Sequence, residues 1–211
     1  TQPNPYSLLN NIDKGTVDRF LGNIFLEATP IDGLTLKVNA GIDKAEQKRR
    51  TYQPKTTLNG NKLQGVGAIY NVDNNQYLLE GTATYSKVLA DIHQINLLAG
   101  TSYEQFNYES SNLSNNNFLT DGFIYNNLGA GIGVKGVGSG YSENKMLSYF
   151  FRSNYILKNR YLLTATLRAD GASVFARNHK WGYFPSVALG WTISEESFMK
   201  KASSWLDILK L

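Results

Sequence analysis

Apolar and polar residues alternate along most of the chain, which is the pattern of β-strands whose two faces meet different surroundings. The clearest run is Leu34–Asp43, where apolar residues at even positions alternate with polar residues or glycine at odd positions. An extension of this strand to Tyr52 is left open. The same alternation predicts six further strands: Val17–Thr29, Gln76–Leu89, Gln94–Phe106, Met146–Leu157, Tyr161–Asp170 and Tyr183–Ile193.

The predicted connections alternate between short and long. Short turns are expected at 30–33, 90–93 and 158–160, and longer polar segments at 53–75, 107–143 and 171–182. In an up-and-down antiparallel meander, every short connection then falls at one end of the strands and every long one at the other. Outer-membrane barrels show this sorting, with short periplasmic turns and longer extracellular loops, whereas a soluble Greek key has no reason for it.

The aromatic residues favour a membrane-spanning β-barrel over a soluble sandwich, although the alternation alone fits both. Tyr149 and Tyr183 lie near the loop ends of their strands, and Tyr155, Tyr161 and Trp191 lie near the tight turns. Tyrosine and tryptophan prefer the headgroup level of a bilayer, so two such girdles around an aliphatic band suit a barrel wall. The predicted fold class is therefore all-β, an antiparallel up-and-down meander that forms part of a large transmembrane β-barrel.

Composition excludes several classes of function. The chain has 211 residues and no cysteine, so disulfide frameworks and thiolate metal sites are impossible. The formal net charge is only +4, and Lys48–Arg50 is too small a basic cluster to predict nucleic-acid binding. No apolar run approaches the roughly 20 residues of a transmembrane helix. The first residues do not have the layout of a signal peptide, so we interpret the chain as an internal piece of a longer protein.

Three stretches resemble the SusC/RagA family of TonB-dependent outer-membrane transporters. They are NRYLLTATLRADGAS (159–173), WGYFPSVALGW (181–191) followed by ISEESF (193–198), and the closing LDILKL (206–211). Weaker similarity extends back to about Asn4. The chain departs from the family pattern at Ala169, Ala172 and 174–176, in and beside one loop.

The resemblance implies a 22-stranded barrel with an N-terminal plug in the outer membrane of a Gram-negative bacterium. Residues 1–211 are then a single segment of about seven strands, without the plug and the remaining strands. The family implies import of glycans, oligosaccharides or peptides, energy coupling through TonB, and a SusD-like lipoprotein as partner. A soluble carbohydrate-binding β-sandwich module is the alternative, and an enzyme is not expected.

No residue pattern predicts a catalytic, cofactor or metal site. The glycine-rich run 131–136 matches G-x-G-x-x-G, but the residues after it cannot form the helix that a dinucleotide site needs. His93 and His179 have no partners at zinc-ligand spacing. A short helix is predicted over Ser194–Lys201, with Ser194 as its N-cap.

Two sets of residues are candidates for contact with a transported substrate. The first set lies on the polar face of the predicted strands Met146–Leu157 and Tyr161–Asp170 and would face the lumen: Arg152, Asn154, Thr164, Thr166, Arg168 and Asp170. The second set consists of aromatic residues expected in or beside the long loops: Tyr70, Tyr108, Phe118, Tyr125 and Trp181. For Trp181, anchoring at the membrane interface is the favoured role.

Overall fold

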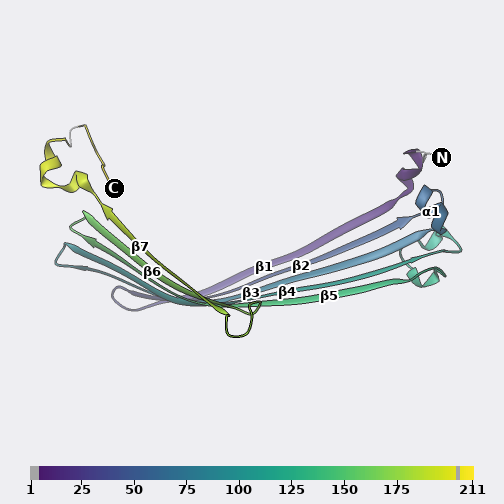
Figure 1. Ribbon diagram of the computed structural model, residues 1–211, viewed down its shortest axis with the longest axis horizontal. Coiled ribbons are helices and arrows are strands. Elements are labelled where there is room, and N and C mark those ends of the chain that lie inside the picture. The colour runs from purple at the N-terminus through teal and green to yellow at the C-terminus, as the bar shows by residue number, and fades with distance from the viewer. Residues whose placement is uncertain (1–4, 203–204) are drawn as a thin grey trace. The chain divides into compact units, whose positions relative to one another are not determined.

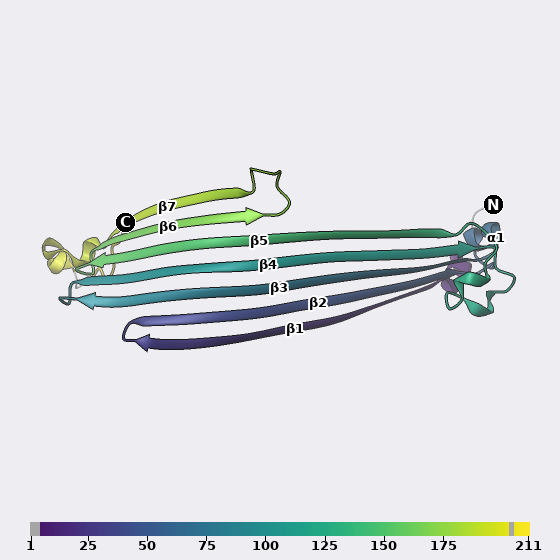
Figure 2. The same cartoon turned by 90° about the horizontal axis from the view of Figure 1, so that it is seen from below.

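The structure is a computed structural model that describes residues 5–202 and 205–211. Within these residues, seven strands form one antiparallel sheet in chain order (Figures 1 and 2), which confirms the predicted meander. The strands are β1 (Ile12–Ile31), β2 (Leu34–Gln53), β3 (Val66–Leu89), β4 (His93–Asn116), β5 (Gly136–Leu157), β6 (Tyr161–Ala172) and β7 (Trp181–Trp191).

Tight turns join β1 to β2, β3 to β4 and β5 to β6, as the sequence predicts. Gly33 in the first turn has a φ of 81°, and a Cβ there would lie 2.4 Å from the backbone oxygen of Ser86, so only glycine fits. The turn after β5 places Lys158 and Asn159 in succession at positive φ, 53° and 56°. Two such residues match the right-handed twist of a hairpin.

The long segments between strands are shorter than predicted, because β3, β4 and β5 continue into them. Residues 66–75, 107–116 and 136–143 were expected in loops but belong to these strands. Asparagine and serine side chains pair across these extensions; for example, Asn71 Nδ2 donates to Ser111 Oγ at 3.2 Å. In 107–116 and 136–143 the prediction was wrong because serine, asparagine and glycine dominate and remove the apolar period that marks a strand. Residues 66–75 still carry alternating apolar residues, but they were included in a long segment predicted as a loop from its glycine and asparagine residues.

The chain divides into two compact units, and β1–β5 contribute residues to both. Unit 1 contains residues 1–22, 42–76 and 106–143, and unit 2 contains residues 23–41, 77–105 and 144–211. Unit 2 holds all of β6 and β7 and carries the clear alternation of apolar and polar residues. Unit 1 holds the polar strand extensions and the two longest loops.

A small aromatic core orders the loops of unit 1. Tyr52, Phe118 and Tyr125 are buried together, and the rings of Tyr52 and Phe118 meet edge to face at 5.7 Å. Tyr52 Oη donates to Asp121 Oδ1 at 2.7 Å, and the backbone N–H of Lys55 donates to the same carboxylate. Lys55 lies in the loop between β2 and β3, which also contains the short helix α1 (Leu58–Leu63), and Asp121 lies in the loop between β4 and β5. These contacts therefore hold the two loops together.

Two 3₁₀-helices, η4 (Ile193–Glu195) and η5 (Ser197–Ala202), follow β7 in place of the predicted α-helix. Thr192 is the N-cap of η4, and Ser194 Oγ is buried without a hydrogen-bond partner among the described residues, so the predicted cap at Ser194 is wrong. Glu196, between the two helices, is buried. Leu211 exchanges two backbone hydrogen bonds with Trp191, at 3.0 and 2.9 Å, and so continues the sheet beyond β7.

Candidate functional site

The apolar face of the sheet in unit 2 is not covered by any other part of the described chain. Its residues come from strands β2–β7 and include leucine, valine and aromatic side chains that are 36% to 80% exposed: Leu36, Val38, Leu79, Tyr103, Tyr149, Phe151, Leu163, Leu167, Tyr183, Val187, Leu189 and Trp191. The described residues form no second sheet that could close over this face as a sandwich. So large an exposed apolar surface requires an apolar partner outside the chain.

The polar face of unit 2 carries a ladder of hydrogen bonds across four strands. Thr164 Oγ1 donates to Asn154 Oδ1 at 3.0 Å, and Asn154 Nδ2 donates to Asn96 Oδ1 at 3.3 Å. Asn96 Nδ2 in turn donates to Ser86 Oγ at 2.8 Å. The ladder satisfies these amides and hydroxyls within the sheet, while the face as a whole remains open to water.

Arg168 is the centre of a second polar cluster on the same face. Its Nε donates to both oxygens of Asp170, at 2.8 and 2.9 Å, and its terminal nitrogen donates to Ser148 Oγ at 3.1 Å. The strand register places Ser148 opposite Asp170 and Arg152 opposite Thr166, so the six predicted lumen-facing residues share one face. Arg152 lies exposed beside this cluster.

The polar side of unit 1 contains a hollow of about 250 Å³, lined by residues of four adjacent strands. Arg19 and Asp43 form a bidentate ion pair at its edge, with nitrogen–oxygen distances of 2.8 and 2.5 Å. The other lining residues are three amides, two aliphatic side chains and one half-exposed aromatic ring: Gln47, Asn74, Gln76, Val17, Ala45 and Phe106. Amide groups that hydrogen-bond and a ring that stacks are suited to sugars and to peptides.

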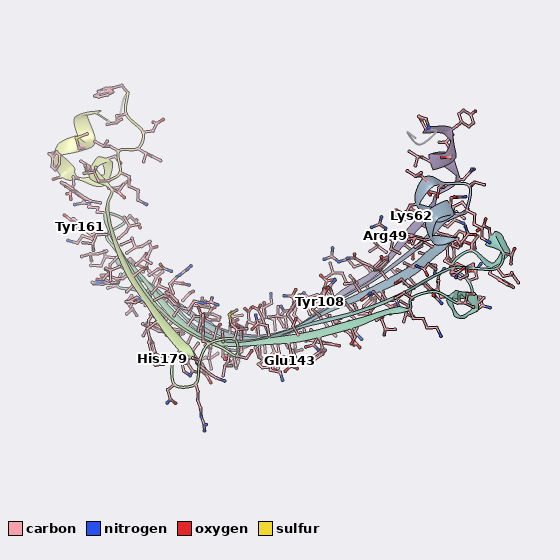
Figure 3. The ribbon with its side chains drawn as sticks, turned by 45° about the vertical axis from the view of Figure 1, so that its right-hand side comes forward. Arg49, Lys62, Tyr108, Glu143, Tyr161 and His179 are labelled. Carbon is pink, nitrogen blue, oxygen red and sulfur yellow. The ribbon has the colours of Figure 1, made fainter. Side chains whose placement is uncertain are left out.

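The predicted aromatic contacts fall into different surroundings. Tyr70 and Tyr108 lie on β3 and β4 rather than in loops, and Tyr70 is 42% exposed. Figure 3 shows Tyr108 and Arg49 on the side of the sheet opposite Glu143. Phe118 and Tyr125 are buried in the aromatic core, so their rings are not available to a ligand in this structure.

Trp181 belongs to the apolar face. Its ring stacks on Tyr149 with centroids 5.9 Å apart and an interplanar angle of 19°, and it covers Gly171 of the neighbouring strand. A role for Trp181 as an anchor at the membrane interface stays a prediction.

Residues 5–202 and 205–211 contain no helix with the length and apolarity to cross a membrane. In the same residues, no three histidine or acidic side chains gather closely enough to hold a metal ion.

Comparison with known proteins identifies the family. No family model matches the chain. The chain is 30% identical over 202 residues to TonB-dependent receptor P3 of Formosa agariphila, and the matched region covers 95% of this chain and 20% of that protein. TonB-dependent receptor P39 of the same organism is 34% identical over 188 residues, covering 85% of this chain and 17% of that protein. TonB-dependent receptor SusC of Bacteroides thetaiotaomicron is 51% identical over 67 residues, covering 32% of this chain and 7% of SusC.

The chain belongs to the SusC/RagA family of TonB-dependent receptors. It spans at most about a fifth of the length of these curated relatives. The fold agrees with this family: a chain of the RagAB peptide importer in its open-open state superposes with a TM-score of 0.87 at 24% identity, over 98% of this chain and 23% of that one. The RagAB peptide transporter gives a TM-score of 0.85 at 23% identity, over 93% and 22% of the two chains.

Proposed function

We propose that this chain forms part of the wall of an outer-membrane transporter that imports an oligomeric nutrient, either a glycan or a peptide. The observation that carries the proposal is the division of the sheet into an uncovered apolar face and a hydrogen-bonded polar face. The apolar face meets lipid, and the polar face borders a water-filled lumen. The family further suggests a 22-stranded barrel with a plug, a SusD-like lipoprotein on the extracellular side, and coupling to TonB.

The dimensions of unit 2 support this placement. Trp181 and Trp191 lie at opposite ends of β7, about 33 Å apart along the strand, or about 25 Å along the membrane normal at a tilt of 40°. This spacing matches the roughly 25 Å apolar band of an outer-membrane barrel. Strands β3 and β4 have 24 residues each, whereas a membrane-spanning strand needs only ~9–11, so both strands extend well beyond the bilayer.

Spin labels on the apolar face test the membrane assignment. Labels introduced at Leu36, Leu97 and Leu163 of the intact receptor are expected to be accessible to oxygen and shielded from a water-soluble relaxation agent. Labels at Thr164 and Thr166, on the polar face, are expected to show the opposite. If the three leucine positions report water in lipid vesicles, the barrel assignment is wrong.

The hollow of unit 1 is our candidate for contact with the substrate. By alternation along β2, Asp43 falls on the same side of the strand as Lys37 and Asn39, which lie on its polar face. Arg19, Asn74 and Phe106 are then proposed to line the lumen. Tyr70, Tyr108 and the six lumen-facing candidates, Arg168 among them, remain further proposed contacts.

Replacing Asn74 by alanine should weaken substrate binding by the intact receptor about two- to tenfold, the effect of losing one neutral hydrogen bond. Asn75→Ala is the matched control, because the neighbouring residue points to the other face and should leave binding unchanged. Growth of a complemented deletion strain on glycan and peptide mixtures first identifies the imported class. Binding of that substrate is then measured by calorimetry. Equal effects of the two substitutions would remove the hollow from the substrate path.

A further inference from the structure

The loop end of the β6–β7 hairpin carries basic residues beside the aromatic residues of the apolar face. Lys145 and Lys180 both line a hollow of about 200 Å³, together with Tyr103, Ser173 and Trp181. Lys145 lies within β5, where its carbonyl accepts a hydrogen bond from Ser173 N–H at 2.8 Å. Lys180 directly precedes β7, and its carbonyl accepts a hydrogen bond from Ala172 N–H at 3.0 Å.

The hollow is apolar on one side and basic at its rim. Met146 and Leu147 line it, and Trp181 closes it where its ring stacks on Tyr149. The rim continues into the loop 173–180, which Figure 3 marks at His179. In this loop, the apolar side chains of Val174 and Phe175 are 63% and 57% exposed.

The charge around the hollow is positive. Lys145, Arg177 and Lys180 supply three positive charges, and residues 173–181 include no acidic residue. The nearest carboxylate along β5 is Glu143, two residues before Lys145. One negative charge against three leaves the site attractive to an anion.

We propose that this hollow binds the phosphorylated headgroup of an outer-leaflet lipid, with the acyl chains lying along the apolar face below Leu147. The inference rests on the proposed membrane position of the sheet. Tyrosine and tryptophan mark the headgroup level, and lysines at that level attract anionic headgroups. Lysine serves as a point charge for phosphate, while the adjoining apolar wall accounts for a lipid rather than a free anion.

Native mass spectrometry of the intact receptor tests this site. The probes are a monophosphorylated lipid A and the same lipid after removal of its phosphate. Each lysine near a charged headgroup contributes roughly fivefold in affinity, so Lys180→Gln should weaken binding of the phosphorylated lipid about fivefold and Lys145→Gln/Lys180→Gln about thirtyfold. The dephosphorylated lipid should bind the wild type as weakly as the phosphorylated lipid binds the double variant.

The matched control is Lys62→Gln/Lys135→Gln, which removes the same charge from the loops of unit 1 and should leave lipid binding within twofold of the wild type. Unchanged lipid binding by the Lys145 and Lys180 variants overturns the inference, as does equal binding of the two lipids. Competition by inorganic phosphate at the same concentration as the lipid also overturns it, because the acyl chains would then play no part. If the spin labels report lipid while the lysine variants bind normally, this inference fails and the proposed function stands.

Discussion

Arginine in place of Val187 is expected to destabilise the intact receptor by about 2–4 kcal/mol, the penalty measured for a basic residue at the midplane of a barrel's lipid face. Val187 is 71% exposed on the apolar face and lies opposite Ala165 on β6, near the middle of both strands. A guanidinium there can reach water only by thinning the bilayer or by displacing its neighbours.

The adjacent Ser186 provides the matched control. It pairs with Thr166 on the polar face, so arginine at this position points into water and should change the free energy of unfolding by no more than about 1 kcal/mol. Both variants are compared by urea unfolding of the receptor in lipid vesicles. The reverse order of stability would mean that the two faces have been assigned the wrong way round.

The alternating strands of unit 2 were predictable because one face of each strand is apolar. The predicted strand Leu34–Asp43 lies wholly within β2. The strand predicted to end at Leu157 ends there as β5, and the strand predicted to begin at Tyr161 begins there as β6. The period of two survives in the sequence wherever lipid on one side and water on the other select different residues. The family resemblance, which rests on stretches between 159 and 211, falls in the same unit.

The strand extensions of unit 1 were not predictable from this signal. Residues 107–116 and 136–143 are rich in serine, asparagine and glycine, a composition typical of loops. Their strand pairing depends on partners in other strands. A Cβ at Gly138, for example, would lie 2.3 Å from Asn112 Oδ1, so the small residues make room for side chains of the adjacent strand. Such complementarity appears only once the register between the strands is known.

The same limit applies to the candidate sites. Alternation alone placed Arg168, Asp170 and Thr164 on one face. The partners Asn96 and Ser86 come from strands far away in sequence and could not be assigned to the ladder. The ion pair between Arg19 and Asp43 needed the register of the β1–β2 hairpin. The turn predicted at 30–33 did not supply it: only Gly33 in this turn has a positive φ, and a strict two-residue turn would have placed Arg19 and Asp43 on opposite faces.

Glu196 is expected to hold the segment after β7 against the sheet. Its carboxylate accepts hydrogen bonds from Tyr161 Oη at 2.7 Å, from the Arg160 guanidinium at 3.0 Å and from Trp191 Nε1 at 3.2 Å. The residue is only 8% exposed. The bond from Tyr161, supported by those from Trp191 and Arg160, lowers the pKa of Glu196 below its ordinary value.

Glutamine at position 196 keeps the shape of the side chain but turns an NH₂ group toward donors, so backbone amides of 192–199 should exchange hydrogen about tenfold faster or more in the intact receptor.

Because the folded pKa of Glu196 is lowered, the ionised carboxylate contributes stability above its ordinary pKa, about 4.3, and this contribution is lost as the pH falls through the folded value. Hydrogen exchange followed by mass spectrometry, corrected for intrinsic rates, should show the wild type approaching the variant as the pH falls below the ordinary glutamate pKa and through the lowered folded value. Glu195→Gln removes the exposed neighbouring carboxylate and should behave as wild type. Equal effects of the two substitutions, or wild-type protection that does not change with pH, would show that the Glu196 contacts do not anchor this segment.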